Sequence, residues 1–346
     1  MSITCAYGKG IAKMLKMFPC ELHTHTIHSD GRLSLLELAG KAKDLGLECI
    51  ALTDHNTISG HAQVQSVMKK TGLYIIRGME WTTFYGHVLA MGIKSYVDWR
   101  DIGPEDIDKG IDNIHKAGGL AGIAHPFCVG SPLCTGCHFK FNVSDWKKVD
   151  YIEVWSEGFP SINPINIRAF DLWTNLLNKG YKISAVSGRD WHGDDGNENP
   201  MAATYIAVQS QNDAGSFETA ALNALKEGKI SVSMGPCISL SAKYGETKYF
   251  IGDNIKKSKE KDKINLAVGF NYDRKLFWTI DNNSLCISFA CNKGVIKKLP
   301  VYNDSDALEC SVDIDGINWL RAELYGNING IETMVGFTNP IYFESR

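Results

Sequence analysis

Short apolar runs alternate with amphipathic segments between residues 21 and 235. The runs contain few polar residues, which is typical of strands buried on both faces of a parallel sheet. We expect strands at 20–23, 49–53, 74–77, 88–91, 120–124, 151–155, 183–186 and 205–208. Alternation of strands and helices over this length predicts an α/β fold, either a barrel or an open doubly wound sheet.

The segments between these runs have helical periodicity. In the first of them, Ser34 can cap a helix and Glu37 follows three residues later, which is the arrangement of a capping box. Its apolar residues, among them Leu35 and Leu38, fall on one helical face. Further helices are expected at 57–71, 104–117, 163–179 and 216–227.

The pattern changes after Gly235-Pro236, where helical periodicity ends. Short alternating runs follow, separated by turns rich in Asn and Gly, at 238–241, 264–268, 285–289 and 319–324. These short alternating runs and turns predict a small antiparallel β-sandwich. We therefore expect two domains, an α/β domain over residues 1–236 and a β-sandwich over residues 237–346.

Histidine and carboxylate residues gather where the predicted strands end. Six such blocks lie at 21–31, 53–56, 78–80, 86–87, 124–126 and 188–192. Metals that catalyse hydrolysis are bound by neutral imidazole and carboxylate groups. In α/β barrels the reacting groups gather at the carboxyl ends of the strands. The pattern therefore predicts a polynuclear metal centre and favours a barrel and a hydrolase.

Spacing within the blocks adds detail. His23 and His25 alternate on a strand, so both side chains point to one face. Glu80 can bridge two metals through its two oxygens. His87 precedes its apolar run, so either its strand enters the site from the opposite direction or the residue lies on a loop.

The overall composition and net charge of the chain limit its expected partners and location. The chain of 346 residues is 44% hydrophobic and has a formal net charge of -3, which disfavours a nucleic-acid duplex as partner. No stretch approaches the length of a transmembrane helix, and residues 1–20 lack an apolar signal core, so we expect a cytoplasmic protein without a membrane role. The sequence pattern does not indicate whether the protein forms oligomers.

Ten cysteines are expected to be reduced thiols in that compartment. Cys134, Cys137 and His138 match a short haem-attachment pattern, which is disfavoured because such attachment needs export. With Cys128 they can instead form a small structural zinc site, or an ordinary loop with inert thiols. The long segment 127–146 follows His125, and we expect it to cover the site and tune substrate choice.

The ordered blocks from His23 to His192 resemble those of the PHP (polymerase and histidinol phosphatase) domain family, a group of metal-dependent phosphoesterases. The segments 235–236, 251–253 and 338–342 are similar to the CehA/McbA-type branch, which carries a β-rich tail. The resemblance implies a distorted (β/α)7 barrel that holds two or three divalent metal ions, with Zn²⁺, Mn²⁺ and Fe²⁺ all suited to its donors.

The resemblance also implies a ligand set in three groups. The first metal would be held by His23, His25, Glu80 and Asp190, the second by Glu80, His87 and His125, and the third by Asp30, His55 and His192. Asp54 would lie outside the ligands and orient one of them.

Such a centre implies hydrolysis by a metal-bridging hydroxide, since even one Zn²⁺ lowers the pKa of bound water to ~7. The expected substrate is a small phosphomonoester or a nucleotide-type phosphodiester. His192 would help the leaving oxygen depart if the third site holds no metal. Arg189 and Arg168 are candidates for binding phosphate oxygens, although Arg189 is equally suited to an ion pair.

Two other readings stay open. The same metal centre can hydrolyse a carbamate, ester or amide, as the CehA/McbA resemblance allows. A non-catalytic binding protein with the barrel as scaffold is disfavoured because no expected ligand is missing. Exonuclease activity linked to a DNA polymerase, known for other members of the superfamily, is disfavoured by the acidic balance and the lack of a polymerase region.

Overall fold

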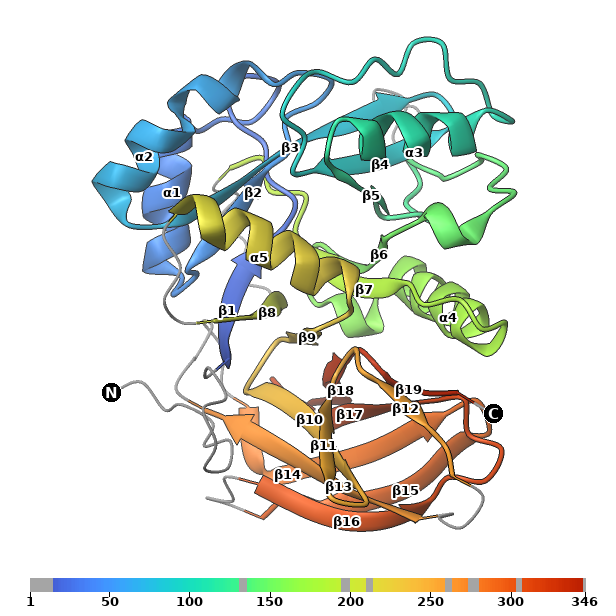
Figure 1. Cartoon of the computed structure of the whole chain (residues 1–346). Helices are drawn as coiled ribbons and strands as arrows, with labels where there is room; N and C mark the ends of the chain where they lie inside the picture. The colour runs from blue at the N-terminus through green and yellow to red at the C-terminus, as the bar shows by residue number, and fades with distance from the viewer. Residues whose placement is uncertain are drawn as a thin grey trace.

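The computed structural model describes residues 15–130, 136–193, 200–209, 214–258, 263–272, 280–302 and 307–344. An α/β part lies above a β-rich part in Figure 1, and the strand β9 lies between them. Among the described residues, no helix combines the length and the apolar character that crossing a membrane requires.

The α/β part is built on strands that lie side by side in their order along the chain. They are β1 (Leu15–Glu21), β2 (Cys49–Leu52), β3 (Tyr74–Thr83), β4 (Gly86–Met91), β5 (Leu120–Ile123), β6 (Tyr151–Ser156) and β7 (Ser184–Gly188). On the other side of β1 the sheet continues through β8 (Ala203–Gln209) and β9 (Ile230–Ser233). The sheet therefore extends well beyond the seven strands expected for a barrel.

Strand directions explain how His87 reaches the site. The pairs β1–β2, β2–β3, β5–β6 and β6–β7 are parallel, whereas β4 is antiparallel to both β3 and β5. His87 lies near the start of β4, so it stands at the same end of the sheet as the residues that close the parallel strands. The prediction that this strand enters from the opposite direction is confirmed.

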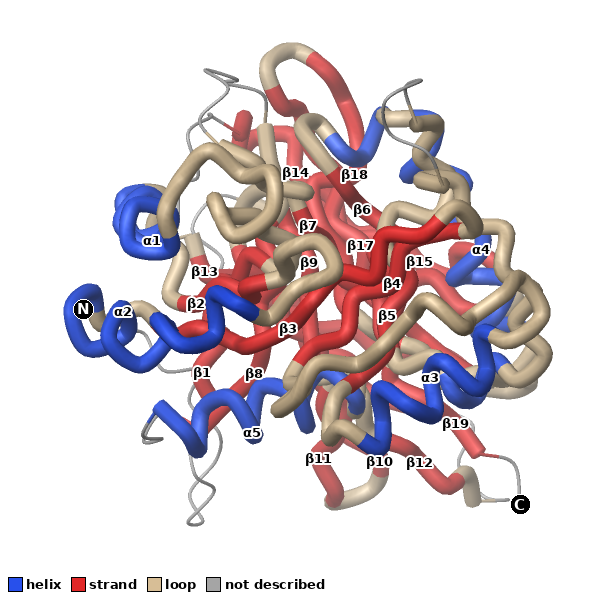
Figure 2. The backbone as a smooth tube through the Cα atoms, turned by 90° about the horizontal axis from the view of Figure 1, so that it is seen from above, coloured by secondary structure: helices blue, strands red, loops and turns tan. Residues whose placement is uncertain are grey.

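Helices lie around the outside of the strands when the molecule is viewed from above (Figure 2). They are α1 (Leu35–Asp44), α2 (Val64–Thr71), α3 (Ile107–Lys116), α4 (Pro164–Asn178) and α5 (Ala214–Lys226). Ser34 caps α1 and forms the predicted capping box with Glu37. The helix expected over 57–71 is wrong in its first half, where a 3-10 turn, η1 (Ser59–Gln63), precedes α2. Ser59 and Gly60 in this turn disfavour a regular helix.

Two further short 3-10 turns are present, η2 (Trp146–Lys148) and η3 (Pro160–Ile162). The strands β7 and β1 are joined by an isolated parallel bridge between Thr24 and Trp191 rather than by a ladder of named strands. Its hydrogen bonds run from His25 N to Trp191 O at 2.9 Å and from Trp191 N to His23 O at 3.0 Å. The structure thus shows a mixed α/β fold with one large sheet, and the bridge draws the ends of β1 and β7 together.

The β-rich part consists of strands in two sheets, and apart from one parallel pair its strands are antiparallel. One sheet has the order β11 (Thr247–Phe250), β10 (Cys237–Tyr244), β13 (Lys263–Asn271) and β16 (Ala307–Asp313). The other strands are β12 (Asn254–Lys256), β14 (Ile280–Cys291), β15 (Gly294–Pro300), β17 (Trp319–Ile328), β18 (Ile331–Thr338) and β19 (Ile341–Glu344), and they extend the large sheet. This arrangement is consistent with the expected C-terminal antiparallel region.

The two parts are continuous in hydrogen bonding and in packing. Strand β18 pairs with β9, with Phe337 opposite Val232, so the large sheet crosses residue 236. One apolar core contains buried residues from both parts. The division into domains at 236 and 237 stays a prediction.

A buried arginine fixes α4 to the β-rich part. The guanidinium of Arg321 lies over the rings of Phe170, Trp173 and Trp319, with 4.4, 4.7 and 5.0 Å from its central carbon to the ring centroids. It donates to Glu323 at 2.8 and 2.9 Å, and only 4% of Arg321 is exposed. A buried charge of this kind is tolerated because it is paired and stacked.

Asn339 makes a second connection across the same boundary. Its side chain is fully buried, accepts a hydrogen bond from Ala185 N at 2.8 Å and donates to Ala185 O at 2.9 Å. The side-chain amide of Asn339 thereby satisfies both backbone groups of Ala185 in β7. We infer that it anchors the strand from which Asp190 follows.

We predict that Asn339→Ala lowers the free energy of unfolding by about 1–3 kcal/mol, because buried backbone groups of Ala185 lose their partner. Urea denaturation followed by circular dichroism measures the change. Asn254→Ala is the matched control, since Asn254 is exposed and accepts only from Lys182 among the described hydrogen bonds. Equal stability of the two variants would contradict the anchoring role.

Candidate metal centre

Nine histidine and carboxylate side chains converge at the carboxyl ends of the parallel strands, joined there by the start of β4. They form three groups in which the donor atoms all lie within 4.8 Å of one another. These groups are His23, His25, Glu80 and Asp190; then Glu80, His87 and His125; then His25, Asp30, His55 and His192. The structure thus brings together every residue that the sequence analysis put forward as a ligand.

Glu80 stands between the groups. It is fully buried in β3, and its Oε1 lies 3.0 Å from His87 Nδ1 and 3.3 Å from His125 Nε2. Its Oε2 lies 2.8 Å from His55 Nδ1 and 3.3 Å from His23 Nε2. Burial favours the neutral acid, but the charge of His23 and the close approach of the surrounding imidazoles hold the pKa of Glu80 well below its usual range. The two oxygens of one ionised carboxylate therefore face different groups.

Asp190 completes the first group from the end of β7. Its Oδ1 lies 2.9 Å from His25 Nε2 and 3.2 Å from His23 Nε2. Although burial opposes ionisation, the charge of His23 and the hydrogen bond from His25 hold the pKa of Asp190 below its usual range. Asp190 and His125 have φ values of 52° and 23°. Such backbone conformations are uncommon for residues with a side chain and concentrate at functional sites.

The third group lies nearer the solvent than the other two. Asp30 Oδ1 is 3.4 Å from His55 Nε2 and 3.1 Å from His192 Nε2, and the side chain of Asp30 is 59% exposed. The ring of His25 stacks on both His55 and His192, with centroids 4.1 Å apart in each case. The geometry therefore adds His25 to the set expected for this group, where it adjoins the first group.

Buried nitrogen and oxygen atoms of these side chains are not satisfied by hydrogen bonds, which is what side chains that bind metal ions would show. Several buried atoms have no hydrogen-bond partner of good geometry among the described residues: both oxygens of Glu80, both ring nitrogens of His25, His87 and His125, Nε2 of His23 and Oδ1 of Asp190. A buried polar group without a partner costs about 1–3 kcal/mol. Coordination of divalent cations by imidazole and carboxylate would satisfy these atoms together.

Asp54 supports the turn that carries Asp30 rather than a ligand side chain directly. Its Oδ1 accepts hydrogen bonds from Thr26 N at 2.7 Å and from the Ser29 hydroxyl at 2.8 Å. The Thr26 hydroxyl donates to the same carboxylate. Asp54 is 2% exposed, so these bonds form in the interior and fix the path of the chain from His25 to Asp30.

Two buried glutamates beside the ligands were missed as functional residues by the sequence analysis. Glu153 in β6 contacts His23, and Glu21 accepts hydrogen bonds from His23 N at 3.0 Å and Arg189 N at 2.8 Å. Burial raises the pKa of Glu21 to about 7, against the lowering effect of Arg189. The available signal was a carboxylate inside, or at the start of, an apolar run.

The two candidate arginines lie in different surroundings. The guanidinium of Arg189 lies over the Trp191 ring at 4.2 Å, beside the ligand block of β7. Arg168 is exposed on α4 and lies over the Phe127 ring at 4.3 Å. Phe127 follows His125 by two residues, so this pair stands close to the end of β5.

The loop after β5 packs against the turn between β3 and β4. Phe139 lies so close to Gly86, whose φ is 142°, that a Cβ atom there would approach the ring to 2.7 Å. Phe127 and His138 form an isolated antiparallel bridge within this loop. Cys134 lies outside the described residues, and no described group of possible metal ligands contains a cysteine. The covering role of segment 127–146 stays a prediction.

Comparison with known proteins agrees with this geometry. A two-domain protein from Bacteroides vulgatus, described as containing a predicted PHP-like metal-dependent phosphoesterase, has the same fold, with a TM-score of 0.52 at 13% identity over 94% of this chain and 96% of that one. The arrangement of an α/β part followed by a β-rich part is thus shared with this solved structure.

Sequence comparison identifies the family. A model described as the PHP domain matches residues 21–105, and an uncharacterized protein of Methanocaldococcus jannaschii is 30% identical over 125 residues, which cover 33% of this chain and 69% of that protein. The chain belongs to the PHP domain family. A 5'-3' exoribonuclease of Haemophilus influenzae is 40% identical over 63 residues, and this match covers 18% of the chain and only 23% of that enzyme.

We predict that Glu80→Gln binds at least one metal equivalent fewer than the native protein, because a neutral amide replaces the carboxylate that faces two groups. Elemental analysis after equilibration with Zn²⁺ measures the content. Glu323→Gln is the control, since it changes an equally buried glutamate that is paired with Arg321 far along the chain. Unchanged metal content in Glu80→Gln would rule out the bridging position.

We also predict that metal binding releases protons. Burial lowers the pKa of His125, but its hydrogen bond to Glu80 and the nearby carboxylates raise it to about 9 in the metal-free protein. His125 is therefore cationic at neutral pH and must lose a proton to become a ligand, so affinity for Zn²⁺ should rise as pH increases toward 9. Calorimetry in two buffers of different ionisation enthalpy counts the protons, and binding without proton release would contradict this assignment.

Proposed function

We propose that this protein is a metal-dependent hydrolase that cleaves small phosphomonoesters or nucleotide-type phosphodiesters. The observation that carries the proposal is the position of Glu80, whose two buried oxygens face separate groups of imidazoles. Paired metal sites of this kind are used to clamp the attacking and leaving oxygens in phosphoryl displacement. Bound Zn²⁺, Mn²⁺ or Fe²⁺ would supply water of lowered pKa and neutralise charge on the phosphoryl oxygens.

The residues of the chain prepare this chemistry. Glu80 and Asp190 are held ionised by the imidazoles around them, so the centre offers negative charge to cations. Apart from the half-buried Asp190, the side chains of the first two groups are buried, which limits the access of bulk water and strengthens electrostatic interactions there. The third group opens to solvent through Asp30 and provides the side from which a substrate enters.

His192 is suited to handle a proton. Its Nδ1 lies 2.8 Å from the carbonyl oxygen of Asp190, and a carbonyl can only accept, so Nδ1 carries the proton. In the neutral ring Nε2 then carries the lone pair, and it lies 3.1 Å from Asp30 Oδ1 and 3.4 Å from His55 Nε2. We propose that this lone pair is a metal ligand when the third group holds a metal. Otherwise the imidazolium form of His192 gives its Nε2 proton to the leaving oxygen and becomes the neutral ring with its proton on Nδ1.

Two arginines are proposed to bind phosphate oxygens at the rim. Arg168 is the stronger candidate because it is exposed and its guanidinium is fixed over Phe127, two residues from the ligand His125. A stacked guanidinium loses less freedom when it binds an oxyanion and can donate two parallel hydrogen bonds. Arg189 is held over Trp191 next to Asp190 and would act from the β7 side.

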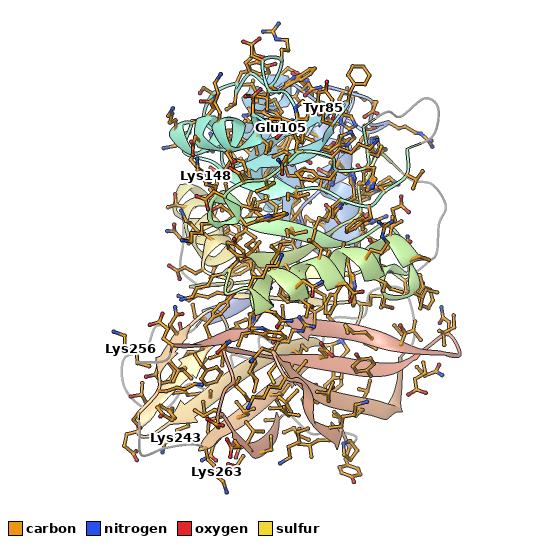
Figure 3. All side chains as sticks on the ribbon, turned by 90° about the vertical axis from the view of Figure 1, so that its right-hand side faces the viewer. Tyr85, Glu105, Lys148, Lys243, Lys256 and Lys263 are labelled. Atoms are coloured by element: carbon orange, nitrogen blue, oxygen red, sulfur yellow. The ribbon has the colours of Figure 1, made fainter. Side chains whose placement is uncertain are left out.

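Apolar residues beside the opening favour a second candidate, hydrolysis of a carbamate, ester or amide with a bulky apolar group. Phe84 and Tyr85 form the turn between Glu80 and His87 and are 74% and 39% exposed. Tyr85 lies at the end of the molecule away from Lys243 and Lys263 of the β-rich part (Figure 3). Ile27, between His25 and Asp30, is 61% exposed.

The remaining expectations are part of the same proposal. The strands β1 to β7 would form a distorted barrel that the Thr24–Trp191 bridge closes at the metal end. The β-rich part would be the sandwich of the CehA/McbA-type branch. The substrate would be a small molecule in the cytoplasm, with neither a nucleic-acid duplex nor a membrane as partner.

We predict that the metal-loaded protein hydrolyses at least one compound in a panel of sugar phosphates, nucleotides, aryl phosphates and aryl phosphodiesters, and that a chelator abolishes the activity. Malachite green measures the phosphate released from monoesters, and the absorbance of the released phenolate measures cleavage of the aryl phosphodiesters, which release no phosphate. Restoration by Zn²⁺ or Mn²⁺, with background turnover for Glu80→Ala, is the expected pattern. Turnover of aryl esters or carbamates but of no phosphate ester would reject the phosphoesterase proposal in favour of the second candidate.

A further inference from the structure

Strand β6 supplies none of the nine ligands, although it lies between β5 and β7, whose ends do. It pairs in parallel with both neighbours, so its carboxyl end points toward the metal centre. Its one acidic residue, Glu153, is only 1% exposed. An isolated ionised carboxylate is expensive to bury, so its surroundings must account for it.

Glu153 contacts a ligand from behind. Its Oε2 lies 2.9 Å from His23 Nδ1, and this is its only hydrogen-bond partner among the described residues. Its Oε1 is buried without a partner. The other nitrogen of the same ring, His23 Nε2, lies 3.3 Å from Glu80 and 3.2 Å from Asp190. The imidazole of His23 therefore connects Glu153 to the first group.

This contact decides where the proton of a neutral His23 resides. An imidazole that binds a metal is neutral and carries a single N–H. In the contact of 2.9 Å the ring N–H donates and the carboxylate oxygen accepts, which places the proton on Nδ1 and directs the lone pair of Nε2 at Glu80 and Asp190.

Gly188, at the end of β7, makes room for the contact. A Cβ atom at this position would lie 2.6 Å from Glu153 Oε2 and 2.6 Å from the Cβ atom of His23. Both distances are shorter than any real contact, and the φ of Gly188 is not in the left-handed region, so closeness and not backbone freedom explains the glycine. Residues from β1, β6 and β7 are thus fitted around one hydrogen bond.

We propose that Glu153 is a positioning residue for the metal centre, which fixes the ring orientation and the tautomer of His23 so that Nε2 is presented as a ligand. The inference rests on the proposed metal-dependent function, because it assigns the residue's purpose to metal binding. Carboxylates that accept from the second nitrogen of a ligand histidine typically change metal affinity or activity 10–100-fold when they are replaced. Glu153 is not one of the nine ligands, and its hydrogen bond to the first group is made through His23.

The first test compares metal affinity of Glu153→Gln with that of Glu323→Gln by competition of the metal-free proteins with a chromogenic chelator for Zn²⁺. The amide keeps the volume of the side chain and removes its charge. We expect a 10–100-fold loss of affinity for the tightest site in Glu153→Gln and less than twofold in the control. Equal affinities, or equal losses in both variants, would overturn the proposal, since the role of Glu153 would then be absent or only structural.

The second test is read on the native protein, and a variant serves only to assign the signal. Long-range ¹H–¹⁵N correlation spectra of the metal-loaded native protein, labelled at histidine, report which nitrogen carries the proton. We expect His23 to carry a slowly exchanging proton on Nδ1, and a proton on Nε2 would overturn the proposal. The signal is assigned by its absence from His23→Gln.

These measurements separate the positioning role from the proposed reaction. Both read metal binding directly, so they apply whether or not a substrate has been found. Lower affinity in Glu153→Gln together with no phosphate release from the native protein would leave the role of Glu153 standing and remove the phosphoesterase assignment. Phosphate release by the native protein, together with unchanged metal affinity in Glu153→Gln, would support the phosphoesterase assignment and remove the role of Glu153.

Discussion

The site depends on one buried carboxylate among imidazoles. Glu80 is fully inside the protein, and its two oxygens lie within 3.5 Å of ring nitrogens from five histidines. Removing a carboxylate from water is unfavourable unless cations or donors surround it. The remaining features of the α/β part can be understood as means of bringing those imidazoles to Glu80, from the parallel strands that deliver His23 and His125 to the reversed strand that delivers His87.

The site also depends on how the ends of β1 and β7 are held. The Thr24–Trp191 bridge and the Glu21 carboxylate, which accepts from the backbone of His23 and Arg189, tie the two ligand blocks together. Asn339 and Arg321 extend this support to the β-rich part, because Asn339 pairs with the backbone of Ala185 in β7 and Arg321 packs against α4. The β-rich part therefore stabilises the strand that precedes Asp190, although it supplies none of the nine ligands.

Much of this arrangement could be predicted from the sequence because local patterns carry it. Apolar runs marked the strands, and the Ser34 and Glu37 pair marked the start of α1. The position of His87 before its run left two alternatives, a reversed strand or a loop, of which the structure shows the first. The missed features are non-local. The hydrogen bond of Glu153 to His23 joins residues 130 positions apart, and the pairing of β18 with β9 carries the sheet across residue 236. The carboxylate inside the apolar run of β6 marks Glu153 as unusual but does not indicate its partner, and no local pattern indicates the pairing of β18 with β9.

The most direct test of the account is a crystal structure of the metal-loaded protein with anomalous diffraction measured at the absorption edge of the bound metal. The account predicts two ions on opposite sides of the Glu80 carboxylate, one beside His23, His25 and Asp190 and the other beside His87 and His125. A single ion with Glu80 bound on one oxygen only, or metal peaks remote from this cluster, would contradict it.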